Sequence, residues 1–247
     1  MNIFFILFYQ PLYNALVWLY EVLPVADIGI PIIVLTLVIK GILFPLTYKS
    51  LKSQRDLQVI QPMIKEIRDK YKDDKEKQAA ELMKIYKDHK VNPLSSCLPL
   101  LIQLPIFFAL FRVLRDGLSE INGEVLYGFV QNPETVNTVF LGIIDLGTIS
   151  IPLAILAAAA QYFQAKQMVA RRPAPEVRKK KGAMDEDMTA MMNRMMIYFM
   201  PFITLSIGLT SLQGGVMLYW VVNTVLTFVL YEIFLNKKKE TKAVEAV

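Results

Sequence analysis

The sequence predicts an all-α polytopic membrane protein, with five transmembrane helices around a hydrophilic groove, a cytoplasmic helical hairpin and an N-terminal interfacial helix. Of its 247 residues, 54% are hydrophobic and only 20% are charged, whereas soluble domains average about a quarter charged residues. The apolar residues gather in long runs: residues 91–111, 146–165 and 195–231 contain no charge, and residues 28–48 contain only Lys40. Because about 20 apolar residues form a helix that crosses roughly 30 Å of hydrocarbon, each run is long enough to span a bilayer.

The run at residues 195–231 is 37 residues long, which is too long for one crossing of ordinary tilt. Gln213, Gly214 and Gly215 lie in its middle and are typical of a turn, so the run is divided into two helices. The five predicted crossings are residues 28–48, 93–115, 146–167, 195–212 and 216–235. Outside the membrane, an extracytoplasmic interfacial helix is predicted at 1–27 and an extracytoplasmic loop at 116–145. The predicted cytoplasmic segments are a helical hairpin at 49–92, a basic loop at 168–194 and a basic tail at 236–247.

The distribution of positive charge predicts the orientation of these crossings. Of the 27 Lys and Arg residues, 12 lie in residues 49–90, eight in residues 166–194 and four after Asn236, whereas residues 116–165 contain none. Basic loops favour the cytoplasmic side of a membrane, so the N-terminus is expected outside and the C-terminus in the cytoplasm. Arg112 and Arg115 deviate from this pattern at the outer end of the second crossing, where their long stems can reach the headgroups.

Residues 1–20 contain no charge and have two interpretations, a helix lying on the outer surface or a sixth span. Gln10, Pro11 and Asn14 interrupt the run, which favours the surface helix. Its apolar positions recur at helical spacing opposite Asn14 and Glu21; they are Leu12, Leu16, Leu19 and Leu23. A sixth span would leave the direction of the later helices unchanged and would place the N-terminus inside.

The predicted cytoplasmic segments differ in character. The helical hairpin has two amphipathic arms separated by Asp73 and Asp74, and Pro62 is expected to kink the first arm. The apolar positions of that arm keep three- and four-residue spacing; they are Leu57, Ile60, Ile64, Ile67 and Tyr71. The loop at 168–194 and the tail are basic, which favours binding to anionic lipid, with ribosome or nucleic-acid contact as the weaker alternative. No specific nucleic-acid ligand is expected.

Lys40 is the single charge within the first crossing. It lies 12 residues after Ile28, which places it roughly 18 Å into the span at about 1.5 Å per residue. A cation at this depth costs about 2.5 to 3.5 kcal/mol, so it should face the bundle interior or a water-filled cavity. Thr36 lies one turn earlier on the same face. The alternative is a lysine whose stem carries the amine to the cytoplasmic headgroups.

Polar faces on the other crossings are candidates for the lining of the same cavity. The last crossing places Tyr219, Asn223 and Thr227 at four-residue steps, with Trp220 beside them. The candidates on the other crossings include Gln103 on the second and Gln161 on the third. Each polar face alone is more typical of contacts between helices. Around one buried cation, however, they together predict a hydrated groove.

The residue inventory excludes several kinds of chemistry. Cys97 is the only cysteine and His89 the only histidine, which excludes an internal disulfide and a metal site built from several histidines. No carboxylate lies in the interior of a predicted crossing, because Glu232 is near the cytoplasmic end of the fifth, so we expect no catalysis, no cofactor and no metal. A wet cationic groove suits another task, which is to carry the polar end of a nascent membrane protein through hydrocarbon while its apolar segment enters lipid.

Residues 92–107, which read NPLSSCLPLLIQLPIF, resemble the signature of the YidC/Oxa family of membrane protein insertases. The similarity extends to residues 37–47 (LVIKGILFPLT), to Ile60-Gln61-Pro62, to Phe199-Met200-Pro201 and to residues 215–223 (GVMLYWVVN). It implies five core helices around a groove open to the cytoplasm and to lipid, in the bacterial cytoplasmic membrane. The family's groove cation is commonly Arg and matches Lys40 here, while Thr36, Gln103 and Trp220 match further groove positions.

The resemblance also implies partners, namely nascent membrane proteins as substrates and a ribosome, a targeting receptor or the Sec translocon at the helical hairpin. The basic residues of this expected docking surface are Lys52, Arg55, Lys65, Arg68, Lys84 and Lys87. The sequence has no large extracytoplasmic domain and no cysteine near its N-terminus, so a lipid anchor is not expected. Two other functions stay open: a scaffold that assembles membrane complexes without moving substrate, and, with less support, a small-molecule transporter.

Overall fold

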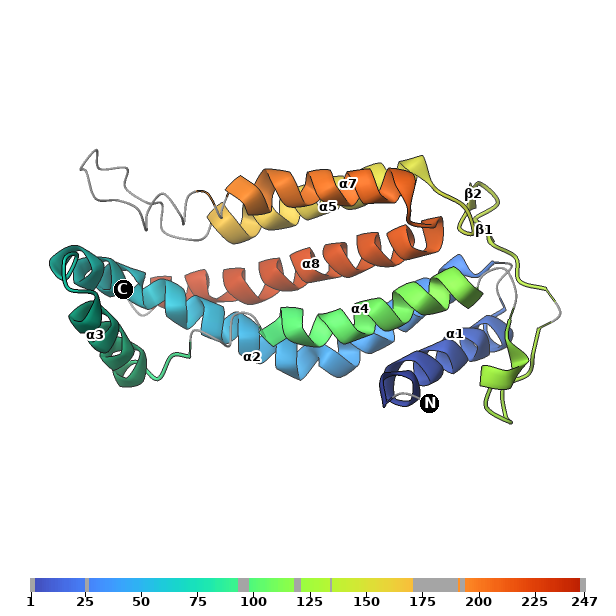
Figure 1. Ribbon diagram of the computed structural model, residues 1–247, viewed down its shortest axis with the longest axis horizontal. Coiled ribbons are helices and arrows are strands. Elements are labelled where there is room, and N and C mark those ends of the chain that lie inside the picture. Colours follow the sequence, from blue (N-terminus) through green and yellow to red (C-terminus); the bar gives the residue numbers. More distant parts are fainter. Residues whose placement is uncertain are drawn as a thin grey trace.

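The computed structural model describes residues 3–24, 27–92, 98–117, 121–133, 135–170, 191 and 194–244, apart from the side chains of residues 54, 55, 58, 98–102, 116, 117, 170 and 234–244. Helices dominate these residues, and one small antiparallel sheet joins β1 to β2 (Figure 1). The elements are η1 (Phe5–Tyr9), α1 (Gln10–Val22), α2 (Gly29–Lys70), α3 (Lys75–Asp88), α4 (Leu98–Gly117), η3 (Gly123–Val125), β1 (Val139–Phe140), β2 (Ile144–Asp145), α5 (Ile151–Ala170), η4 (Met195–Phe199), α7 (Met200–Thr210) and α8 (Gly214–Val244).

Helix α8 is the centre of the bundle. It packs against α5 on one side and against α2 and α4 on the other, while α7 packs on α5 (Figure 1). Helix α1 contacts α2 and α4 at the end of the molecule where α2 and α8 begin. We call this the loop end, because residues 121–150 also lie there; α3 lies at the opposite end (Figure 1).

Within the part of the chain that the structure describes, two helices have the length and apolar composition to cross a membrane, over Gly29–Ser53 and Gly214–Ile233. A shorter apolar helix covers Met195–Thr210. Helix α5 is 20 residues long, but the polar side chains in its second half, including Gln161, Gln164 and Lys166, reduce its apolar character. The described residues therefore agree with a helical membrane protein, and the prediction of five crossings with its segment boundaries stays a prediction.

The first predicted crossing and the first arm of the hairpin form one helix, α2, which passes through Pro45 and Pro62 without ending. After a turn at residues 71–74, the Asp74 side chain accepts a hydrogen bond from the Lys77 amide at 3.1 Å and caps α3. The buried Gln78 amide donates to the Arg68 carbonyl at 3.1 Å, so it satisfies a carbonyl at the end of α2.

A small apolar cluster holds the two arms of the hairpin together. Its buried members are Ile60, Ile64 and Val91, and Leu57, Leu82, Ile85 and Tyr86 pack against them. The three- and four-residue spacing of the first arm thus forms the side that faces α3.

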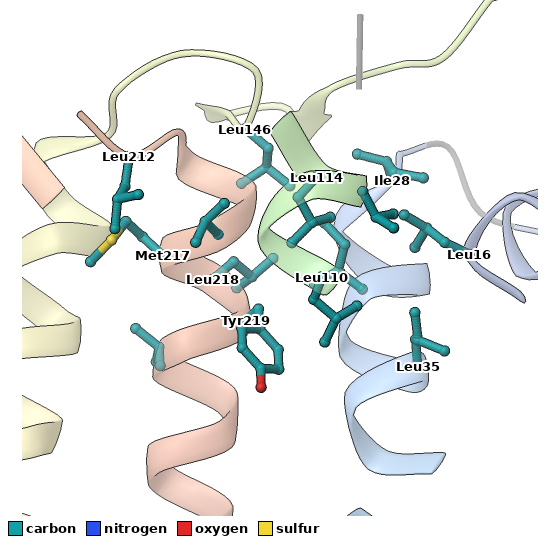
Figure 2. Close-up of a cluster of buried hydrophobic side chains, with 14 of the residues drawn as sticks. Leu16, Ile28, Leu35, Leu110, Leu114, Leu146, Leu212, Met217, Leu218 and Tyr219 are labelled. Atoms are coloured by element: carbon teal, nitrogen blue, oxygen red, sulfur yellow. The ribbon is translucent and has the colours of Figure 1, made fainter. Parts of the chain in front are cut away.

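The main apolar core lies at the loop end. Figure 2 shows Ile28, just before α2, Leu35 of α2, Leu110 and Leu114 of α4, and Leu218 of α8 in this core, whereas Met217 of α8 points to the other side, toward α5. Leu146, from the segment between β2 and α5, is wholly buried above them, and Leu16 of α1 joins from the side. The starts of α2 and α8 and the end of α4 are therefore tightly packed together.

Asn14, which the sequence places opposite the apolar positions of α1, does not lie on an exposed face. Asn14 is buried, and its amide nitrogen donates to the carbonyls of Gln10 at 2.8 Å and Val125 at 3.0 Å. Its carbonyl oxygen accepts from the Tyr127 amide. Large apolar side chains are exposed instead, namely Leu7 of η1 and Trp18 and Val22 of α1. The reason is that Asn14 satisfies backbone groups of a loop more than 100 residues away, which helical spacing alone does not reveal.

The replacement Asn14→Leu should destabilise the loop end. It leaves the Tyr127 amide without its partner, while the Val125 carbonyl keeps the hydrogen bond from the Gln10 side chain at 3.1 Å; one unsatisfied group costs about 1–3 kcal/mol, so we expect a loss of about 1–3 kcal/mol. Thermal unfolding of the purified protein in detergent would measure it. Gln131→Leu, an exposed amide on the same loop, is the matched control. Equal melting temperatures for the two variants would contradict this role.

Candidate functional site

The Lys40 amine donates a hydrogen bond to the Thr227 hydroxyl oxygen at 2.9 Å, which joins α2 to α8. Lys40 lies 11 residues after the start of α2 and Thr227 lies 13 residues after the start of α8, so both are well inside the two candidate spans. The Thr227 hydroxyl in turn donates to the Asn223 carbonyl at 2.7 Å. No carboxylate of the described residues forms an ion pair with Lys40.

Thr227 is the last step of a polar row on α8 that also contains Tyr219 and Asn223. We call these three residues the polar row. At its other end, the Gln103 amide of α4 donates to the Tyr219 hydroxyl. The row covers eight residues, or about 12 Å of helix at 1.5 Å per residue. It therefore connects α8 to α4 at one end and to α2 at the other.

Burial decreases along the polar row. Tyr219 is only 3% exposed and belongs to the apolar core, and Figure 2 shows its hydroxyl directed away from the leucines of that core. Asn223, Thr227 and Lys40 are half-buried. On α2, the next residues after Lys40 include Gly41, Ile42 and Phe44, which are exposed. Tight packing therefore ends between Tyr219 and Lys40.

Two residues expected in the groove make other contacts. Thr36 is only 2% exposed, and its hydroxyl donates to the Ile32 carbonyl of the same helix at 2.6 Å. Trp220 is half-buried, and its ring packs edge-on against Phe107 of α4, with 5.3 Å between the ring centroids. Both therefore contribute to packing next to the polar row, although neither has a hydrogen bond to Lys40 among the described contacts.

Gln161 lies on the other side of α8 from Lys40. Its side-chain oxygen accepts a hydrogen bond from the Thr204 hydroxyl, which joins α5 to α7. The structure thus brings Lys40, Asn223, Tyr219 and Gln103 together along one face of α8, and Gln161 forms a separate polar contact.

Two hydroxyl residues make these contacts. The sequence predicted Thr227 as part of the polar face of the last crossing, because it lies four residues after Asn223 on the same face. Thr204 was not predicted and had no signal in the sequence, since its partner Gln161 is 43 residues away.

The basic residues of the expected docking surface lie on both arms of the hairpin. Lys52, Arg68, Lys84 and Lys87 are exposed, Lys65 is half-buried, and the side chain of Arg55 lies outside the described residues. The exposed amines and the Arg68 guanidinium are accessible to an acidic partner, as surface charges on a solvated helix usually are.

The chemistry available at the polar row is the binding of a negatively charged or hydrogen-bonding group. An ammonium has three donors and no acceptor, and Thr227 receives one of them. The described residues contain no group of three or more His, Cys, Asp or Glu that could hold a metal ion.

Comparison with known proteins gives a consistent relationship over almost the whole chain. The family model described as 60Kd inner membrane protein matches residues 18–242. The membrane protein insertase YidC of Pelobacter propionicus is 33% identical over 228 residues, which are 92% of this chain and 38% of that protein. The relative of the same name from Wolinella succinogenes is 33% identical over 97% of this chain and 39% of its own length.

The chain thus spans less than two-fifths of the length of these two relatives. The membrane protein insertase YidC of Fusobacterium nucleatum is closer in length: it is 33% identical over 214 residues, which are 87% of this chain and 88% of that protein. With a family model that covers most of its residues and a relative of similar length, this chain belongs to the 60Kd inner membrane protein family.

Proposed function

We propose that this chain is a membrane protein insertase and chaperone. It receives nascent membrane proteins in a positively charged hydrophilic groove and releases their apolar segments into the bilayer. The insertase activity of its relatives, as their names give it, supports this function. The observation that carries the mechanism is the half-buried amine of Lys40, which among the described residues is bonded only to a neutral hydroxyl.

The packing around Lys40 supports a groove that is closed at the loop end. Leu35 and Tyr219 mark the edge of the apolar core, and Lys40 lies little more than one turn beyond Leu35. An ammonium inside a membrane costs about 2.5–3.5 kcal/mol, and one neutral hydrogen bond offsets only about 1 kcal/mol of this. Water, or an anionic group of a substrate, is therefore needed at the remaining donors.

The mechanism follows from this incomplete solvation. The polar, often acidic, end of a substrate loses less solvation free energy beside a hydrated amine than in hydrocarbon. The carboxylates of that end contact Lys40, while Asn223 offers both a donor and an acceptor half-way along the polar row. Burial of about 20 apolar residues in lipid then drives the substrate out of the groove, without nucleotide hydrolysis.

The proposal includes the membrane topology predicted from the sequence. Five helices cross the bacterial cytoplasmic membrane, the N-terminus and the loop end lie outside, and the helical hairpin and the C-terminus lie in the cytoplasm. Anionic lipid binds the basic loop and tail, and the hairpin docks a ribosome, a targeting receptor or the Sec translocon. The even distribution of exposed basic residues over both arms supports a broad docking surface.

Replacing the amine of Lys40 should impair insertion. We expect Lys40→Ala to slow insertion of a short substrate with an acidic tail by about 10- to 100-fold, because a charge-assisted hydrogen bond contributes about 1.5–3 kcal/mol. Lys40→Arg keeps the positive charge and should retain most of the activity. Insertion into vesicles that contain the purified protein, read out by protease protection of the substrate tail, would measure both.

Matched variants separate the charge from other effects. Thr227→Val removes the acceptor of Lys40 and should slow insertion less than Lys40→Ala, whereas Thr210→Val, an exposed threonine bonded within α7, should have no effect. The loss in Lys40→Ala should shrink for a substrate with a neutral tail. Full activity of Lys40→Ala with the acidic tail would instead favour a scaffold that moves no substrate.

Charge reversal on the hairpin should impair delivery of substrate. The exposed Lys84 and Lys87 lie one turn apart on α3, outside the apolar cluster of the hairpin. We expect Lys84→Glu with Lys87→Glu to weaken association with vesicle-bound protein about tenfold for ribosomes that carry a nascent membrane protein, as measured by co-sedimentation at low salt.

Neutral replacements at the same two positions should give an intermediate loss. The helix content of the reversed variant, measured by circular dichroism, should stay unchanged because both side chains are exposed. Unaltered ribosome association in the reversed variant would rule out this pair as docking residues.

A further inference from the structure

The turn between β1 and β2 exposes apolar side chains to an unusual degree. We call Leu141, Gly142 and Ile143 the turn tip. Leu141 is 63% exposed and Ile143 is 82% exposed, and neither belongs to the apolar core. Large apolar side chains held in the open at a loop end are a candidate interaction surface.

The turn tip is attached to the start of α2. One carboxylate oxygen of Asp27 accepts from the Gly29 amide at 2.8 Å and caps α2, while the other accepts from the Leu141 amide at 3.3 Å. The Phe140 ring covers Gly29 so closely that a Cβ there would lie 2.1 Å from a ring carbon, so only glycine fits at this position. The turn tip therefore lies at the level where the candidate span Gly29–Ser53 begins.

The second strand is attached to the start of α8 in a similar way. The Gly214 and Gly215 amides donate to the carbonyls of Thr148 at 2.7 Å and Leu146 at 2.9 Å. The Asp145 carboxylate accepts from the Thr138 hydroxyl at 2.7 Å and from the Gly147 amide at 2.9 Å, and these bonds lower the pKa of Asp145. The charge of Asp145 is thus stabilised within the turn. Hydrogen bonds attach the same turn to the starts of both candidate spans.

The backbone of Leu141 has a φ of 52°, in the left-handed region that favours glycine or asparagine. Gly142 follows with a φ of 72°. An exposed leucine gains nothing from packing within the chain that would offset this disfavoured conformation. Its apolar side chain is therefore expected to act on something outside the chain.

The position of the turn tip favours lipid as the partner of its exposed apolar side chains. The segment that follows exposes further large apolar side chains: Ile149 lies before α5, and Ile151, Ile155 and Leu156 lie in its first turns. The starts of both candidate spans define the level of the membrane boundary, and the turn is bonded to both. Residues 116–165 contain no Lys or Arg, so this segment itself has no basic side chain that would keep its surface in water or select an acidic protein.

We propose that the turn tip inserts the side chains of Leu141 and Ile143 into the boundary between headgroups and acyl chains at the loop end. It acts as a fixed anchor that sets the depth at which α2 and α8 enter the bilayer. Because Lys40 and Thr227 lie at fixed distances along these two helices, the anchor also sets the depth of the polar row. This inference does not depend on insertase activity.

A dye attached at residue 143 tests the proposal in the full-length protein. Ile143→Cys is made together with Cys97→Ser, which removes the only native cysteine, and is labelled with bimane in phosphatidylcholine vesicles. Asn132→Cys, at an exposed polar position of the same loop region, is the matched control. Iodide on both sides of the membrane reports contact with water, and lipids with a nitroxide high on the acyl chain report contact with the boundary.

The expected result is strong quenching at residue 143 by the nitroxide lipid and several-fold weaker quenching by iodide than at residue 132. Adding Leu141→Asp should raise iodide quenching at residue 143 toward the control, because a carboxylate is poorly tolerated in lipid. If that variant does not accumulate, Leu141→Gly, which suits the positive φ, should act in the same direction.

Three results would overturn the anchor. Equal iodide quenching at residues 143 and 132 would place the turn tip in water. Shielding of residue 143 from both quenchers would indicate a protein surface or a second copy of the chain. Unchanged quenching in both Leu141 variants would show that this side chain does not hold the tip in lipid.

Discussion

An ammonium group with one neutral partner constrains everything around it. Lys40 donates to the Thr227 hydroxyl, and no carboxylate of the described residues neutralises it. A close-packed apolar environment at this level would raise the free energy of the charged amine by several kcal/mol, because burial of an unpaired charge is costly. The helices around Lys40 therefore have to leave access for water or for an anion, whereas the helix ends nearer the loops are free to pack tightly. The half-buried state of Asn223, Thr227 and Lys40 agrees with this requirement.

Helix α8 contributes both to the tightly packed core at the loop end and to the accessible surroundings of Lys40. Its first turns contribute Val216, Met217 and Leu218 to a core that also contains wholly buried residues of α4 and the loop residue Leu146. Two turns later the side of α8 that faces α2 is polar. The opposite side of α8 contacts α5, where Gly208 of α7 allows close approach of Ala154 and Met217: a Cβ at Gly208 would lie 2.9 Å from both. The tightly packed half of the bundle at the loop end thus supports the half around Lys40, which has to stay accessible to water or to an anion.

Sequence patterns predicted the features that depend on a single helix and missed those that depend on contacts between distant segments. The depth of Lys40 and the four-residue steps of Tyr219, Asn223 and Thr227 follow from helical geometry, so they were available from the sequence. Thr36 shares the face of Lys40 in that geometry, yet its hydroxyl is already bonded to the Ile32 carbonyl. Gln161 was polar and correctly placed inside a helix, but periodicity does not say which neighbour a face meets, and Thr204 is that neighbour. The burial of Asn14 and the cover of Phe140 over Gly29 both rest on pairs more than 100 residues apart.

The chemistry of lysine, as opposed to arginine, fits the geometry of this acceptor. A guanidinium presents a planar fork of donors that matches a carboxylate in two-point contact, whereas an ammonium is a compact charge whose donors rotate freely. Thr227 offers one oxygen, which accepts from Lys40 while its own hydrogen is donated to the Asn223 carbonyl at 2.7 Å. This leaves the amine oriented by a single contact, with its other donors directed elsewhere. Such a group attracts acidic chains without selecting one geometry, and we infer that low geometric selectivity suits a site that has to accept the polar ends of many different substrates.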